Sequence, residues 1–529
     1  MSFLETLTNI NNAINDFVWV KLGLILLLGT GILMTILTKF FQITHIGHWF
    51  KQTAGSMGNK KVSGHTGEQS ISQFQALCTA LAATVGVGNI SGVAAAICSG
   101  GAGAVFWMWI AAFFGMMTNY SENVLGIYYR RKNQKGEWSG GAMYYLRDGL
   151  GAKKGCKGIG KFLAVLFAIF CLLASFGIGN MGQINKIVAN FESAFKIEAL
   201  SSRILYSTES GSVSLYALII GIAIMIFGGL IIVGGLQRIA SFAEKIVPFM
   251  VVAFVLGSLI IIGVHFNAIG AAFKAIFVTA FAPKAVWGGA TGVVIKQVIT
   301  WGFKRGVFSN EAGLGSSVMV HSNSNVKEPV RQGMWGIFEV FADTMVVCTM
   351  TALVILTSGV IDLETGILAE NAGTDATLVA SAFDTVFTFG NVHVGSMFIA
   401  IAILLFAFTT VLGWSHYGSK AFEFLFGTKA TIFYKIFFVL MMISGAVLTS
   451  SIAWDISDTF NGLMMIPNLI GVLSLSGLVA KITNNYIDRK IKGKKDVEPM
   501  LSAFPDIQME QEAAMLNEEE QAEQVTVNS

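Results

Sequence analysis

Long apolar segments separated by shorter polar stretches set the pattern of this chain. A membrane-spanning helix needs about 20 mostly apolar residues, and about eleven segments of the sequence meet that length. We expect spans near 17–43, 72–99, 104–128, 162–188, 214–235, 240–265, 270–303, 333–358, 394–417, 431–450 and 453–481. The pattern therefore predicts an all-α polytopic membrane protein, with boundaries uncertain by a few residues.

Composition supports a membrane protein and argues against several other classes. The chain is 54% hydrophobic and only 13% charged, whereas soluble domains carry about 25% charged residues. Its net charge of +3 gives no basic field for nucleic acid. The five cysteines form no CxxC pair and the seven histidines form no HExxH motif. We expect no enzyme, no cofactor and no nucleic-acid partner.

The positions of Lys and Arg predict the orientation, because basic loops remain in the cytoplasm. Basic residues gather in alternate loops, as in 130–157 and 489–495, whereas the loop 359–392 has none. We therefore expect the N-terminus outside and the C-terminus in the cytoplasm. The segment 483–529 turns from basic to acidic, which is typical of a disordered tail, with regulation or partner binding as the alternative.

Glycines in the middle of the second span predict a broken helix. Gly86, Gly88 and Asn89 lie about fourteen residues from its start, roughly 21 Å along a helix and therefore near the membrane midplane. A polar asparagine is costly there unless it finds a partner. Small-residue packing between helices is the alternative explanation of this pattern.

A second break is expected in the segment 270–303. Gly288, Gly289, Thr291 and neighbouring residues interrupt it, and this placement delivers Lys304 and Arg305 to the inner surface. A rival break at 306–310, in the sequence GVFSNEAG, places the same two basic residues near the midplane, which is expensive.

The two breaks are five spans apart, an odd number, so the two halves of the chain are inverted relative to each other. Matching broken helices in inverted halves indicate a secondary transporter with its binding site at the midplane. We expect one extra N-terminal helix and a five-plus-five inverted-repeat core. The predicted units are 1–45 (extra helix), 46–71 (cytoplasmic linker), 72–266 (first repeat), 267–482 (second repeat) and 483–529 (cytoplasmic tail).

Several motifs carry a resemblance to a known family. They are TALAATVGVGNISGVAAAI (79–97), FGIGNMGQ (176–183), RGVFSNEAGLGS (305–316), FAFTTVLGW (406–414) and WDISDTFNGLMMIPN (454–468). With these motifs the chain resembles the alanine or glycine:cation symporter family of the amino acid–polyamine–cation transporters. The resemblance implies import of a small neutral amino acid with Na⁺ by alternating access. It also implies a multi-pass protein in the plasma membrane of a prokaryotic cell.

The resemblance also implies a substrate site. The substrate carboxylate is expected at the N–H groups around Gly86, Gly88 and Asn89, and the ammonium at the carbonyls around Gly288 and Gly289. Gln183 is implied as a further pocket residue, with bonding between helices as the alternative, and Thr291 belongs to the same set. Ala290 stands where the family usually has phenylalanine, at a position that the resemblance implies faces the substrate, so the loss of the ring is expected to enlarge the pocket.

For Na⁺, the resemblance implies the hydroxyls of Thr409 and Thr410 facing carbonyls near Val85 and Gly88. Because neighbouring threonines point in different directions on a helix, one of them is expected to be the fuller ligand; back-bonding to the same helix is the alternative. Proton coupling in the same fold is a second hypothesis, and an ion channel is a more remote one.

Overall fold

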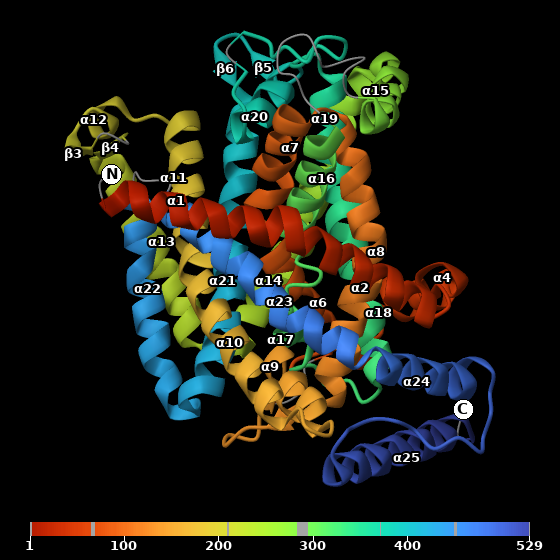
Figure 1. Ribbon diagram of the computed structural model, residues 1–529. Coiled ribbons are helices and arrows are strands. Elements are labelled where there is room, and N and C mark those ends of the chain that lie inside the picture. Colours follow the sequence, from red (N-terminus) through yellow and green to blue (C-terminus); the bar gives the residue numbers. More distant parts are fainter. Residues whose placement is uncertain are drawn as a thin grey trace.

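The computed structural model describes residues 3–64, 69–208, 211–282, 295–370, 372–448 and 452–527. Its helices form one bundle (Figure 1), with the hairpin of β5 (Thr388–Phe389) and β6 (Val392–His393) at one end and helix α25 (Pro505–Val527) at the other. We call these ends the upper and the lower end, as Figure 1 shows them. In the predicted orientation the upper end faces outward.

Within the described residues, seven helices are long and apolar enough to cross a membrane. They are Glu5–Leu37, Lys157–Ala194, Leu215–Val233, Gly235–Val264, Pro329–Thr357, Val394–Phe426 and Thr428–Val447. Two further pairs pass the same test but are bent, Gln73–Thr84 with Gly88–Gly100 by 53° and Asp455–Ser474 with Ser476–Ile491 by 58°. The predicted helical membrane architecture is therefore confirmed, while the count of eleven spans and the inverted repeat remain predictions.

The helices of the N-terminal half alternate with turns and two short hairpins. They are α1 (Phe3–Asp16), η1 (Phe17–Gly23), α2 (Leu24–Leu37), α3 (Phe41–Thr44), α4 (Ile46–Gln52), α5 (Lys60–Ser63), α6 (Gln73–Thr84), η3 (Gly88–Gly92), α7 (Val93–Gly100), α8 (Gly103–Tyr128), α9 (Ala142–Tyr144), α10 (Lys157–Phe176), η6 (Gly177–Met181), α11 (Gly182–Ala194), α12 (Glu198–Ser201), α13 (Leu215–Val233) and α14 (Gly235–Val264). The hairpins pair β1 (Arg131–Lys132) with β2 (Trp138–Ser139) and β3 (Ile204–Thr208) with β4 (Gly211–Ser214), both antiparallel.

The C-terminal half contains the following main helices. They are α15 (Ile269–Phe281), α16 (Ile295–Asn310), α17 (Val318–His321), α18 (Pro329–Val340), η9 (Phe341–Cys348), α19 (Thr349–Thr357), α20 (Ala376–Asp384), α21 (Val394–Phe426), α22 (Thr431–Val447), α23 (Ile452–Ser474), α24 (Ser476–Tyr486), η11 (Ile487–Ile491) and α25. The N-terminal helix, α1 to α2, lies diagonally beside α23 (Figure 1). It therefore packs against the last helix of the predicted core.

Two helices depart from a simple apolar span for identifiable reasons. Helix α8 occupies the predicted span 104–128, but its lower half carries Asn119, Glu122 and Asn123, all fully buried. The predicted span 453–481 is not one straight helix, because the chain bends by 58° where α23 gives way to α24 at Leu475. Helix α24 then leaves the bundle at its lower end (Figure 1).

The tail differs from the disorder that its composition predicts. Helix α25 packs under the lower end, where Lys132 pairs with Glu510 at 2.7 Å and the Arg131 guanidinium lies 3.8 Å from the Phe504 ring centroid. Leu501, just before this helix, is only 1% exposed. An acidic helix that meets a basic loop and buries an apolar residue has partners that composition alone does not reveal.

Two apolar clusters fill the bundle. One gathers side chains from α6, α14, α19 and α21, and the other from α8, α10, α18 and α23. Peripheral helices instead present large apolar residues outward, such as Phe249 on α14 and Phe433 on α22, which are 64% and 71% exposed. That arrangement fits a lipid environment.

Candidate functional site

The predicted break in the second span is present. Helix α6 ends at Thr84, Val85 leaves the helical region with φ −76° and ψ 85°, and the chain resumes at η3 in a new direction. The Asn89 side chain caps the break, since its Oδ1 accepts the Gly86 N–H at 2.9 Å. Short π-helical segments such as η3 often occur at functional sites.

Glycine is required at the first position of the break. A Cβ on Gly86 would lie 2.4 Å from Thr410 Oγ1 on α21, closer than any real Cβ contact. A Cβ on Gly88 would lie 3.2 Å from the Phe308 ring on α16, a tight but less severe approach. The glycines therefore allow α16 and α21 to approach the broken backbone closely.

Thr410 faces the end of α6. Its hydroxyl is 3.1 Å from the Ala82 carbonyl oxygen and 2.9 Å from the Phe406 carbonyl oxygen of its own helix. The Ala82 carbonyl lies in the last turn of α6, where carbonyls lack helical partners and the helix dipole favours a cation. The hydroxyl and this carbonyl together supply oxygen ligands of the kind that a hard cation prefers.

Thr409 points elsewhere. Its hydroxyl lies 3.0 and 2.9 Å from the Leu405 and Phe406 carbonyl oxygens of its own helix, and 3.8 Å from the Met250 sulfur on α14. This is the back-bonding that the sequence left open as an alternative. Of the two threonines, Thr410 is the one that the fold brings to the broken helix.

Gln183 lies beside the same break, at the start of α11 and directly after η6. Its amide donates to the Ile178 carbonyl oxygen at 3.1 Å, and its Oε1 is 3.6 Å from the position of a Cβ on Gly86. That oxygen is buried and has no hydrogen-bond partner among the described residues. The neighbouring Asn180 and Asn185 instead donate to backbone carbonyls in the middle of α22 and just beyond its end, so they bond helices together.

Sequence reasoning missed Asp343, which lies on η9 against the break. Its carboxylate accepts hydrogen bonds from Asn89 Nδ2 at 2.6 Å, from Ser309 Oγ at 2.8 Å and from Thr344 Oγ1 at 2.8 Å. It is fully buried, and none of the described cationic side chains pairs with it. The available signal was the pair of carboxylates, Glu339 and Asp343, inside the apolar span 333–358, where a charged group is costly unless it is functional.

Helix α16 corrects the predicted position of Lys304 and Arg305. Gly302 packs against Ala104 and Trp107 near the upper end of α8, so the two basic residues lie in the upper part of the bundle and not at its lower surface. Lys304 pairs with Asp458 on α23 at 2.9 Å. A lysine ammonium at this depth in a membrane is costly, and the ion pair with Asp458 offsets that cost.

The described part of the second broken region shows no break within 306–310, the rival placement. Helix α16 continues through 306–310 and ends at Asn310, level with Gly115 on α8, and Glu311 has a left-handed φ of 55°. The predicted break at Gly288, Gly289, Ala290 and Thr291 lies outside the described residues.

Buried carboxylates hold the irregular segment that follows α16. Glu311 accepts from Trp414 at 2.9 Å, and Glu339 lies 2.9 Å from His321 Nε2. Glu122 accepts from Asn468, which also donates to the Gly313 carbonyl oxygen at 2.8 Å. This segment therefore has several specific attachments to the bundle between the break and its lower end.

A bundle of apolar helices, one of them broken against buried polar groups, defines a membrane transport protein of the discontinuous-helix kind. The sequence model of the sodium:alanine symporter family matches residues 4–500, and the chain belongs to that family. The protein is accordingly a cation-coupled amino-acid symporter and not an enzyme.

Three relatives show the range of the family. The chain is 42% identical to the "Sodium/alanine symporter AgcS" of Methanococcus maripaludis, over 90% of this chain and 96% of that protein. It is 34% identical to the "Probable sodium/glutamine symporter GlnT" of Bacillus subtilis, over 93% of each chain. It is 33% identical to the "Putative sodium/proton-dependent alanine carrier protein YrbD" of the same organism, over 91% of this chain and 93% of that protein.

Proposed function

We propose that the protein imports a small neutral amino acid, alanine or glycine, together with Na⁺ by alternating access. The observation that carries this proposal is the junction of α6, α11 and α21. There the Thr410 hydroxyl meets a carbonyl at the end of α6, and the free Gln183 carbonyl faces the broken backbone. Oxygen ligands for a cation and polar groups for a zwitterion thus meet at one break.

The ion site of the proposal uses Thr410, with carbonyls of α6 and of the break near Val85 and Gly88. The negative end of the α6 dipole points to this position, which favours a cation there. Thr409 has a lesser part, because its hydroxyl is directed to its own helix and to Met250. The orientation of Thr410 thus supports a single threonine ligand.

The substrate site of the proposal uses the other side of the break. The carboxylate binds the N–H groups of Gly86, Gly88 and Asn89, at the start of the half-helix η3 to α7, where the dipole favours an anion. In this conformation the Asn89 side chain accepts the hydrogen bond of the Gly86 N–H. In the proposal this side chain rotates away when the substrate carboxylate binds. The ammonium binds carbonyls around Gly288 and Gly289, beside Ala290 and Thr291.

The arrangement of the whole chain belongs to the same proposal. The repeats 72–266 and 267–482 rock against each other around the site, and the N-terminus faces outward from a prokaryotic plasma membrane. The name of one relative mentions protons as well as sodium, and that of another glutamine. Proton coupling and a larger substrate are therefore the alternatives that an experiment must separate.

The test is radiolabelled Na⁺ entry into proteoliposomes that contain the purified protein. Alanine outside should stimulate Na⁺ entry in a saturable manner, and protein-free vesicles are the control. Na⁺ entry that is equally fast without any amino acid would identify a channel and end the proposal. Competition by glycine, serine and glutamine then shows which side chains the pocket accepts, and an Ala290→Phe variant should accept fewer of the larger ones.

A further inference from the structure

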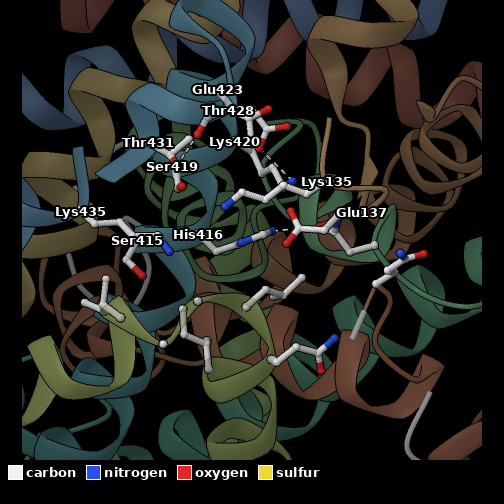
Figure 2. A pocket seen from close by; sticks show the side chains of 18 of the residues that line it. Lys135, Glu137, Ser415, His416, Ser419, Lys420, Glu423, Thr428, Thr431 and Lys435 are labelled. Carbon is white, nitrogen blue, oxygen red and sulfur yellow. Dashed lines mark hydrogen bonds and ion pairs between the residues drawn. The ribbon is translucent and has the colours of Figure 1, made fainter. Parts of the chain in front are cut away.

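A polar cavity of about 140 Å³ lies at the lower end of the bundle (Figure 2). The lower half of α21, the first residues of α14 and α22, and the turn between β1 and β2 line it. His416 on α21 is six residues below Thr410, about 9 Å along the helix. None of the described residues of the break or of the proposed transport site lines this cavity.

The cavity has an excess of positive charge. Lys420 pairs with Glu423 at 3.1 Å, and Glu423 also accepts from Asn133 and Ser139. That pair is satisfied internally. Lys135 and Lys435 also line the cavity, and within the described part of the chain neither makes an ion pair.

The same two lysines face each other with little compensation. Lys435 is under the electrostatic influence of Lys135, Lys420 and Glu137. Glu137 is the one acid in this group outside the Lys420 pair, and one of its oxygens accepts from Asn133 at 3.0 Å. Two like charges that act on each other in a half-buried site are destabilising, and an anion bound between them would relieve that repulsion.

A helix end adds donors to the same cavity. The 30-residue helix α14 begins at Gly235, and the Lys435 ammonium nitrogen lies 3.6 Å from the Cβ position of that glycine. The first N–H groups of a helix lack helical acceptors and carry partial positive charge, so this end favours an anion.

A buried hydroxyl points to the same kind of ligand. Ser419 lines the cavity, is only 9% exposed, and its hydroxyl makes no hydrogen bond with any described residue. Thr428 is buried to the same extent and lines the same wall. Two lysines, the start of α14 and the Ser419 hydroxyl together form the kind of donor set that phosphate oxygens require.

The surroundings of the cavity are apolar and face outward. Near Lys435, α22 exposes Phe433 by 71% and Phe437 by 53%, and α13 ends beside the cavity with Leu230 exposed by 63% and Val233 by 58%. Basic pockets between transmembrane helices, next to lipid-facing surfaces, are sites for anionic lipid headgroups.

We propose that this cavity binds a phosphate group, carried either by the headgroup of an anionic phospholipid or by a soluble phosphate compound. The phosphate lies between Lys135 and Lys435, at the first N–H groups of α14. The site tethers the α13–α14 corner to α22 and α21 and takes no part in binding the transported amino acid.

The test uses the full-length protein, purified and delipidated in neutral detergent. Thermal unfolding is measured during titration with phosphatidylglycerol, phosphatidylcholine or inorganic phosphate. Phosphatidylglycerol should raise the melting temperature in a saturable manner and phosphatidylcholine should not. Saturable stabilisation by inorganic phosphate alone, with phosphatidylglycerol no better, identifies a soluble ligand; stabilisation only by phosphatidylglycerol identifies a lipid. Either result supports the phosphate site.

Variants locate the site. Lys435→Gln and Lys135→Gln should each weaken the phosphate ligand by about fivefold, as expected for one basic residue near a charged headgroup. Lys429→Gln removes an exposed lysine from the same lower loop but outside the cavity, and it should change nothing. Lys435→Arg keeps the charge and should retain binding, which guards against misfolding. If neither phosphate source stabilises the wild type, or if Lys429→Gln weakens binding as much as Lys435→Gln, the proposal is wrong.

Discussion

The Thr410 hydroxyl is the most specific element of the proposed Na⁺ site, and Thr410→Val tests it. Valine has nearly the same shape, so it preserves the close packing against Gly86, where a Cβ would lie 2.4 Å from Thr410 Oγ1. The change removes only the oxygen that lies 3.1 Å from the Ala82 carbonyl oxygen. The loss is therefore one polar ligand, without a cavity.

One such contact to a charged group contributes about 1.5–3 kcal/mol. We therefore expect the half-saturating Na⁺ concentration of Thr410→Val to rise roughly 10- to 150-fold. The matched control is Thr409→Val, because that hydroxyl bonds only to carbonyls of its own helix and lies near Met250. For this control we expect a change of no more than about twofold, since a hydroxyl bonded to its own helix does not reach the ion.

The assay is the initial rate of radiolabelled alanine uptake into proteoliposomes as a function of Na⁺ concentration. Size-exclusion chromatography of each variant establishes that it is folded. An unchanged Na⁺ dependence in Thr410→Val would refute the ion-site assignment. A rise in Thr409→Val as large as that in Thr410→Val would refute the argument from side-chain direction.

Three further predictions follow from other contacts. Asp343→Asn should lower alanine uptake by about tenfold or more, because it weakens three buried hydrogen bonds to a charged group; normal uptake by a folded variant would show that the carboxylate is dispensable. Gly86→Ala should lower the melting temperature, because the added methyl group overlaps Thr410 Oγ1, and a second change, Thr410→Ala, should restore part of the loss; a fully stable Gly86→Ala would contradict the packing. Burial raises the pKa of Asp375, but the Lys186 ammonium at 2.9 Å and the hydrogen bonds from Thr377 together outweigh it and leave the pKa below its ordinary value. The protection of amides around Asp375 against hydrogen exchange, corrected for the intrinsic pH dependence of exchange, should therefore be high at neutral pH and decrease as the pH falls below about 4, and Lys186→Gln should reduce this dependence; an identical pH profile in the variant would count against the ion pair.

The membrane fold and the first break were predictable because lipid imposes simple constraints. A helix must be about 20 apolar residues long to span, and a break at mid-depth needs glycine and a polar partner. The segment 72–99 satisfies both conditions, and the structure breaks it between Thr84 and Gly88. The family resemblance also implied Thr409 and Thr410, with carbonyls near Val85 and Gly88, as ion ligands, and this remains a prediction.

The remaining features depend on neighbours that the sequence does not specify. The choice of Thr410 over Thr409 follows from which side of α21 faces α6. That side is known only once the packing of the helices is known. Lys304 was placed too low because its depth was counted from an assumed break, and its partner Asp458 is more than 150 residues away. Asp343 was overlooked because an acid in an apolar span shows its role only once its partner, here Asn89, is beside it.

The central claim is that an inward Na⁺ gradient drives amino-acid import by this protein. The most direct measurement is radiolabelled alanine uptake into proteoliposomes under a Na⁺ gradient alone and, separately, under a H⁺ gradient alone. The account predicts accumulation above equilibrium with the Na⁺ gradient and only equilibration with the H⁺ gradient. Accumulation driven by the H⁺ gradient in the absence of Na⁺ would contradict it.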